Sequence, residues 1–278
     1  FTVSYYMGLW KSNLQIFLEN KKNNKGDLLT LGSQHCNFNY EEIKKFFAQK
    51  NYPICQHKFY KNNLKNVKKD SINSKTFFEM LGFSKIDELD FDNYEGSNLI
   101  GDLNKIIEVK KKYDFVFDGG TVEHVFNVKN SMTNVVNFLK PGGIIMHSFP
   151  LSGWVNHGYY SFSPCMFYEF YLQNKFDNFE FYIIENYKYI NREKYFKVEN
   201  IYSDFNNNSE IKKTLGVFLA KKTTNMDITL PIQDAYKKSY LNKKLNFYKT
   251  PKKKFSQKFL IFIKIILEII SDSMSKIK

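Results

Sequence analysis

Short apolar runs alternate with amphipathic segments between residues 28 and 221. Apolar runs that are bounded by glycine or polar residues are typical of buried parallel strands. Parallel strands are expected at residues 28–31, 86–89, 99–100, 115–117 and 144–149. Two further apolar segments, 179–184 and 214–221, predict strands that pair antiparallel at the edge of the same sheet.

Apolar residues at helical spacing predict helices at 10–18, 40–47, 76–81, 106–112, 128–139 and 164–173. Gly82, Pro141 and the pair Ser163-Pro164 are the residue types that end or begin helices. Strands that alternate with helices predict an α/β fold, with a mostly parallel sheet and helices on both faces. Ligands of such a sheet bind beyond the carboxyl ends of its strands, so the residues after each strand are the candidates for a site.

The residues after the first two strands suit a ligand that contains a ribose. Gly32 ends the first strand, but the turn Gly32-Ser33-Gln34 lacks the GxGxxG pattern that a nicotinamide dinucleotide requires. Asp90 follows the strand 86–89, where a carboxylate can accept hydrogen bonds from both ribose hydroxyls. Asp92 is a rival for this role, and an aspartate at a strand end also suits an ordinary turn.

Residues 113–150 read YDFVFDGGTVEHVFNVKNSMTNVVNFLKPGGIIMHSFP. This strand, glycine turn, helix, Pro-Gly-Gly turn and second strand, with "DFVFDGG", "EHV" and "LKPGG", resemble the second half of a class I S-adenosylmethionine-dependent methyltransferase. The resemblance implies a Rossmann-like fold with a mostly parallel, seven-stranded sheet, and S-adenosylmethionine as the cofactor. The family usually carries a GxGxG-like turn after its first strand, and this chain departs from that pattern by keeping only Gly32.

The resemblance also implies roles for residues at the strand ends. The turn with Gly32 and Gln34 would approach the methionyl part of the cofactor, and Asp118 and Gly119 would let it approach the backbone after the strand 115–117.

After the strand 99–100, Asp102 would meet the adenine amino group, and the backbone of Leu103 a ring nitrogen. Asp102 also suits the N-cap of a helix over 103–112. His124, in the "EHV" triplet, would lie at the ligand-binding edge or else be a structural histidine.

The segment after the strand 144–149 reads GWVNHGYYSFSP. It is similar to stretches in methyltransferases from bacterial surface-polysaccharide gene clusters, as are Tyr94-Glu95-Gly96 and the "LTLG" turn. The resemblance implies methyl transfer to a sugar hydroxyl or a sugar-linked phosphate group, with His157 or His124 as the general base. The acceptor pocket would comprise Trp154, Asn156, Tyr159 and Tyr160, although an aromatic loop that closes the core has the same composition.

The net charge of +13 suits an anionic acceptor. Arg192 is the only arginine, whereas specific recognition of nucleic acids favours the guanidinium group, so we expect no nucleic-acid partner. Two alternatives remain at this point. One is a catalytically inactive, methyltransferase-like scaffold, which the reduced glycine turn favours, and the other is a nucleic-acid methyltransferase, which the charge favours.

The three cysteines, Cys36, Cys55 and Cys165, form no CxxC pair, and their odd number predicts a reducing, cytoplasmic location. The spacing of His35, Cys36, Cys55 and His57 matches no zinc motif, so the sequence predicts no metal site.

Two domains are expected, with residues 1–222 as the methyltransferase domain and 223–278 as a C-terminal extension. Residues 252–278 are basic and apolar, which predicts a helix that docks on the domain or on a second subunit. The alternative is a helix that lies in an anionic membrane interface.

Overall fold

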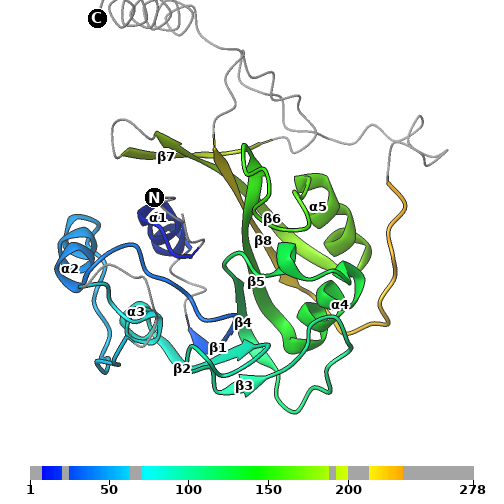
Figure 1. The fold of residues 1–278 in the computed structure, drawn as a ribbon, viewed down its shortest axis with the longest axis horizontal. Helices are drawn as coiled ribbons and strands as arrows, with labels where there is room; N and C mark the ends of the chain where they lie inside the picture. The colour runs from blue at the N-terminus through cyan, green and yellow to red at the C-terminus, as the bar shows by residue number, and fades with distance from the viewer. Residues whose placement is uncertain (1–7, 21–24, 63–69, 188–191, 200–212, 234–278) are drawn as a thin grey trace, which may run out of the picture. The chain divides into compact units, whose positions relative to one another are not determined.

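The computed structural model describes residues 8–20, 25–62, 70–187, 192–199 and 213–233. Within these ranges a single sheet has the strand order β3-β2-β1-β4-β5-β8-β6-β7 (Figure 1). The strands are β1 Gly26–Leu31, β2 Phe83–Asp90, β3 Leu99–Ile100, β4 Tyr113–Asp118, β5 Leu139–Ser152, β6 Phe176–Tyr187, β7 Arg192–Lys197 and β8 Thr214–Lys222. The predicted C-terminal helix at 252–278 lies outside the described residues.

The strands β1 to β5 pair in parallel, which gives the structure the predicted Rossmann-like α/β fold. The strand β8 lies antiparallel between β5 and β6, so the predicted antiparallel pairing is confirmed. The described sheet has eight strands rather than the expected seven, because Arg192–Lys197 adds β7 beside β6. The strand order reverses between β1 and β4, and their carboxyl ends therefore form the switch point where such sheets bind ligands.

Helices cover both faces of the sheet (Figure 1). Neighbouring strand residues such as Leu28 and Leu29 belong to the two separate apolar cores that these helices close. None of the helices in the described ranges is long and apolar enough to cross a membrane. One face carries α1 Lys11–Glu19, α2 Tyr40–Gln49 and α3 Ser74–Leu81, and the other carries α4 Val128–Phe138 and α5 Pro164–Gln173.

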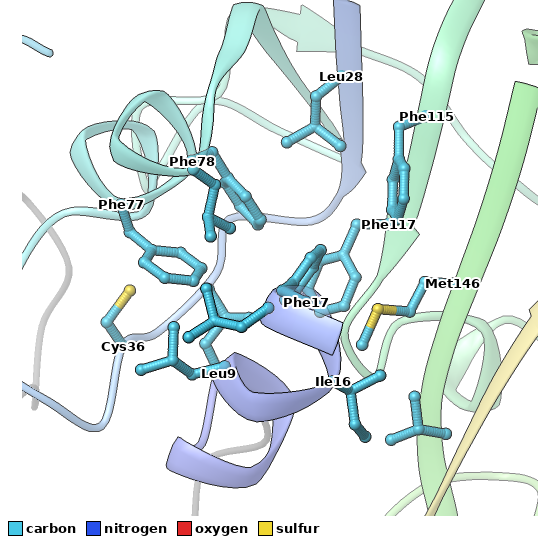
Figure 2. Packing of buried hydrophobic residues seen from close by; sticks show 14 of the residues in the cluster. Leu9, Ile16, Phe17, Leu28, Cys36, Phe77, Phe78, Phe115, Phe117 and Met146 are labelled. Carbon is cyan, nitrogen blue, oxygen red and sulfur yellow. The ribbon is translucent and has the colours of Figure 1, made fainter. Parts of the chain in front are cut away.

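Phe17 of α1 is at the centre of the first core, which Figure 2 shows. Its ring centroid lies 5.9 Å from that of Phe115 and 5.5 Å from that of Phe117, both on β4. The rings of Phe77 and Phe78 on α3 contact it edge-on at 6.1 and 5.8 Å. These contacts fix α1 and α3 against the strand that leads into the candidate site.

The predicted helix over residues 106–112 is wrong, because this segment is irregular. Side chains of α4 take up its backbone groups instead. Asn134 Oδ1 accepts a hydrogen bond from the Ile107 N–H at 2.9 Å, and Asn134 Nδ2 donates to the Lys105 carbonyl at 2.8 Å. Asn134 thus satisfies two backbone groups at the start of the segment in a non-helical conformation.

Candidate active site

The turn after β1 brings the ends of three strands together. Gly32 has a φ of +75°, which favours glycine, and its N–H donates to the Leu89 carbonyl of β2 at 2.7 Å. Thr121, after β4, donates from Oγ1 to the Leu31 carbonyl at 2.6 Å. A Cβ on Gly32 would stand 2.9 Å from this Oγ1, so the turn needs glycine for this close approach as well.

Gln34 packs directly on the turn that follows β4. Its buried side chain donates from Nε2 to the carbonyls of Leu31 at 2.8 Å and Gly32 at 3.1 Å. A Cβ on Gly119 would collide with Gln34 Oε1. The two predicted cofactor-binding residues Gln34 and Gly119 are therefore neighbours, and a ligand at this turn would meet the Gln34 amide next to the Gly119 backbone.

Asp90 lies at the end of β2, with its carboxylate toward the Gly32 turn. Its Oδ2 accepts from the Ser33 N–H at 3.3 Å and its Oδ1 from the Phe91 N–H at 2.7 Å. A carboxylate has about four lone-pair positions, so both oxygens retain capacity for further donors. Asp92, the rival residue, is exposed and accepts from the Tyr94 N–H at 2.8 Å within its own turn.

Asp102 lies in the turn after β3. Its Oδ1 accepts from the Asn104 backbone N–H at 2.9 Å and from Asn104 Nδ2 at 3.0 Å, and these hydrogen bonds lower the pKa of Asp102. The Lys105 ammonium lies 3.6 Å from its Oδ2. Asp102 does not cap a helix, since residues 103–112 form none, and the side chain of Leu103 is buried in the second core.

The carboxylate of Asp118 points into the protein rather than toward a ligand. Its Oδ1 accepts from the Thr121 N–H at 2.8 Å, and its Oδ2 lies 2.6 Å from His147 Nδ1. His147 Nε2 lies 2.7 Å from the Tyr171 hydroxyl, and all three side chains are buried. Burial and the charge of Asp118 raise the pKa of Tyr171. Asp118, predicted as a cofactor contact, thus holds the β4 turn and connects it to β5 and α5.

A carboxylate and two histidines gather beside this turn. Glu123 and His124 belong to a short 3₁₀ helix, η2 (Val122–His124), and His157 lies in the loop after β5. Glu123 is 0% exposed, and its Oε1 lies 3.9 Å from His157 Nε2. The rings of His124 and His157 lie edge to face, with centroids 5.0 Å apart. The structure thus brings together the two histidines that the sequence proposed as bases.

Electrostatics in this cluster oppose charge on every member. Burial, with the nearby charge of Asp118, raises the pKa of Glu123 well above its ordinary value. Burial lowers the pKa of His124, although Asp118 opposes this effect. Burial, His124 and Lys213 lower the pKa of His157. Without a ligand, the cluster therefore favours neutral histidines.

The loop after β5 presents its predicted pocket residues in different ways. Trp154 is buried, donates from Nε1 to the Thr214 carbonyl at 2.9 Å, and packs against the His157 ring at a centroid distance of 5.2 Å. Trp154 therefore supports His157 from the core instead of lining an open pocket. Asn156 is exposed, with a φ of +62° that turns the loop.

Both tyrosines of this loop meet Phe126. The Tyr160 hydroxyl donates to the Phe126 carbonyl at 2.8 Å. The rings of Tyr159 and Phe126 lie edge to face at 5.7 Å and are 69% and 71% exposed. This pair forms an exposed aromatic surface beside the loop.

On the other side of the Gly32 turn is a polar pocket of about 190 Å³. Ser33 lines it, together with Glu88 and Lys75, which form an ion pair at 3.2 Å. The sequence predicted no pocket here and gave Glu123 no role, although Glu123 belongs to the "EHV" triplet. The signal for Glu123 was its place in the segment that follows the predicted buried strand 115–117.

No protein-family model matches the chain, and no curated protein matches it. Among solved structures, TehB from Haemophilus influenzae is 17% identical, with a TM-score of 0.36, over 53% of this chain and 52% of TehB. The chain thus spans about half the length of TehB. A complex of DhpI with SAH is 12% identical, with a TM-score of 0.36, over 77% of this chain and 86% of the other. An S-adenosylmethionine-dependent methyltransferase from Clostridium acetobutylicum is 10% identical, with a TM-score of 0.33, over 78% of this chain and 93% of the other. Likeness at this level does not extend to activity or substrate.

Proposed function

We propose that this chain is an S-adenosylmethionine-dependent methyltransferase. The observation that carries the proposal is the convergence of Gly32, Asp90 and Asp102 at the carboxyl ends of β1, β2 and β3. The resemblance of residues 113–150 to class I methyltransferases supports the same cofactor. This cofactor, when bound, supplies an electrophilic methyl group on a sulfonium sulfur.

The residues present fit such a cofactor. Asp90 retains lone pairs on both oxygens for the ribose hydroxyls. Asp102 Oδ2, whose partner is the exposed Lys105 ammonium at 3.6 Å, retains a lone pair for an amino group of the adenine. The Gln34 amide and the Gly32 turn would hold the methionyl part. These contacts orient the cofactor, and alignment with the acceptor is the main contribution that the protein makes to an in-line displacement.

For the acceptor, we propose a hydroxyl or a phosphate-linked group of a bacterial surface-polysaccharide precursor, in the cytoplasm. The similarity of the GWVNHGYYSFSP loop to methyltransferases of such gene clusters supports this class, and the net charge of +13 suits an anionic acceptor. The exposed rings of Tyr159 and Phe126 are suited to stack on a sugar. The His157 side chain is 19% exposed and its Nε2 has no hydrogen-bond partner among the described residues, which makes it the first candidate to take the hydroxyl proton.

Isothermal titration calorimetry of the full chain with S-adenosylmethionine and S-adenosylhomocysteine tests the cofactor directly. We expect one site, and a loss of affinity in Asp90→Ala of about 1.5–3 kcal/mol, because hydrogen bonds to a charged group are removed. Asp92→Ala is the matched control and should bind like the unchanged chain. An absence of binding heat together with an unchanged Tm would exclude the cofactor.

A non-catalytic, methyltransferase-like binding protein is the second candidate. The contact of Gln34 with Gly119 favours it, because a side chain occupies space that a cofactor would otherwise approach. In that case Gln34→Gly should create cofactor affinity that the unchanged chain lacks. A methyltransferase instead binds the cofactor with Gln34 in place. A third candidate, a nucleic-acid methyltransferase, would show salt-dependent binding of RNA or DNA.

A further inference from the structure

The carboxyl group of Glu123 is buried, and no side chain of the described residues compensates the cost of its burial. The residue is 0% exposed, and neither carboxylate oxygen has a hydrogen-bond partner in the described part of the chain. His157 Nε2, 3.9 Å from Glu123 Oε1, is also buried without such a partner. Buried polar groups are nearly always satisfied, and a buried carboxyl group without partners costs stability in either protonation state. Two orphaned groups that face each other therefore indicate a ligand that the protein is built to receive.

The backbone holds these groups in a fixed arrangement. The Glu123 carbonyl accepts from the N–H groups of Tyr159 at 2.9 Å and Tyr160 at 3.3 Å, which attaches the loop after β5 to η2. A Cβ on Gly158 would stand 2.9 Å from the Glu123 carbonyl oxygen, so this close approach needs glycine. Trp154 supports the His157 ring from the core side. The site is therefore preorganised by elements far apart in sequence.

We propose that Glu123, His124 and His157 bind a divalent transition-metal ion. One potential ligand atom of each residue lies within 4.8 Å of the others. A carboxylate and two imidazoles are a donor set that zinc and iron(II) accept in proteins, whereas magnesium and calcium prefer oxygen alone. Metal–ligand bonds of about 2.0–2.2 Å require these atoms to approach one another a little further, through small rotations of the exposed His124 ring and the 19% exposed His157 ring. The positive ion would compensate the buried carboxylate.

The ion would lie beside the proposed cofactor site. Thr121, two residues before Glu123, contacts the Gly32 turn through its hydroxyl. Three protein ligands leave coordination positions open for an oxygen atom, and a bound hydroxyl loses its proton more readily. This second step rests on the proposed function. It makes His157 a ligand of the ion. The acceptor hydroxyl would lose its proton to solvent on binding the ion, and its oxygen would then bond to the methyl carbon while the carbon–sulfur bond of the cofactor breaks and S-adenosylhomocysteine is released.

Metal binding itself is measured without any enzymatic assay. The full chain, freed of metal with a chelator, is titrated with Zn²⁺, Mn²⁺ and Co²⁺ by calorimetry, and thermal unfolding is recorded with and without each ion. We expect one ion per chain, a rise in Tm on binding, and weaker binding of Mg²⁺ and Ca²⁺. Co²⁺ should give the absorption bands of a site with nitrogen ligands.

Glu123→Gln is the decisive variant, because glutamine retains the size of the side chain and removes the charge. It should fold at least as stably as the metal-free chain, yet lose the rise in Tm and more than about tenfold in metal affinity. His157→Ala should lose affinity similarly. The matched controls are Glu95→Gln and His35→Ala, because these residues form another glutamate–histidine pair, with 3.7 Å between His35 Nε2 and Glu95 Oε1. Both controls should bind the ion like the unchanged chain.

Two results would overturn the proposal. One is the absence of specific binding of all three ions, and the other is a Glu123→Gln variant that binds them as tightly as the unchanged chain. Neither result would bear on the proposed cofactor binding, because cofactor affinity depends on Asp90 and is measured separately. A chain that binds S-adenosylmethionine but no metal would retain the proposed function, with His157 as the base. A chain that binds metal but no cofactor would retain the metal site alone.

Discussion

Two acidic residues near opposite ends of the parallel strands, Asp87 and Glu123, differ in the partners that the fold gives to their carboxyl groups. Toward the amino ends, Lys111 Nζ lies 2.8 Å from Asp87 and 3.2 Å from Asp27, and the Tyr113 hydroxyl donates to Asp87 at 3.0 Å. At the carboxyl ends, the carboxyl group of Glu123 is buried without a hydrogen-bond partner among the described residues. Paired acids such as Asp87 connect strands and stabilise the fold. An unpaired buried acid such as Glu123 costs stability, and its retention indicates a ligand.

The pKa directions express the same difference. Burial alone would raise the pKa of Asp87, but hydrogen bonds from Lys111, Asn98 and Tyr113 outweigh it, and the pKa lies below its ordinary value. For Glu123, burial raises the pKa and no cation opposes it. Burial is therefore not sufficient to identify a functional acid. Asp87 and Glu123 are distinguished by whether hydrogen-bond donors and cations compensate the carboxyl group.

The largest effect is expected at the carboxyl ends, in His157→Ala. Turnover should fall by roughly 10²–10⁴-fold, whether the histidine takes a proton or binds the proposed ion. Cofactor affinity should hardly change, since the ribose and adenine contacts lie elsewhere. Release of S-adenosylhomocysteine in the presence of sugar-phosphate acceptors measures turnover. His124→Ala tests the second histidine, and a His157→Ala enzyme with full turnover at every pH would exclude the role.

Asp87→Ala should lower stability, whereas His157→Ala should lower turnover. We expect a loss of about 1.5–3 kcal/mol in the free energy of unfolding, because charge-assisted hydrogen bonds to Asp87 disappear. Cofactor affinity should stay the same. Urea denaturation and calorimetry measure the two quantities. Equal stability of the variant and the unchanged chain would mean that the paired acids do not stabilise the fold.

The stabilising effect of Asp87 should depend on pH in a definite direction. Its pKa in the folded state lies below the ordinary value of 3.8, so its contribution is complete above that value and is lost as the pH falls through the folded pKa. The difference in unfolding free energy between the unchanged chain and Asp87→Asn should therefore be largest near neutral pH and shrink below about pH 4. A difference that grows toward acid pH would contradict the assignment.

Glu123→Gln should have the smallest effect on the metal-free chain. Replacing an uncompensated buried acid by an amide should leave the free energy of unfolding unchanged within about 0.5 kcal/mol, or raise it. Urea denaturation in the presence of a chelator measures this quantity. A loss as large as that of Asp87→Ala would show that Glu123 stabilises the fold, and the contrast between the two ends of the strands would then disappear.

Much of the fold follows from local pattern. The apolar run before Gly32 forms β1, and Gly82 ends α3 in the left-handed conformation that the sequence predicts. The predicted helix at 106–112 failed because Asn134, in a different element, binds its backbone. Nothing in the local pattern of residues 106–112 contains that information.

The site was accessible to sequence reasoning only in part. The position of Asp90 after a strand made it a candidate with Asp92 as its rival, because the ends of parallel strands converge at one edge. The burial of Glu123 and the contact of Gln34 with Gly119 depend on loops that meet only in the folded chain. Trp154 was assigned to a pocket because aromatic residues suit both pockets and cores, and its partner, the Thr214 carbonyl, lies 60 residues away.

A crystal structure of the full chain with S-adenosylhomocysteine would test the central claim most directly, that the carboxyl ends of the strands form the binding site. We expect S-adenosylhomocysteine to lie against the Gly32 turn, with its ribose hydroxyls within hydrogen-bonding distance of Asp90 and its adenine near Asp102. Electron density for the ligand elsewhere on the chain, or no binding at saturating concentration, would contradict it.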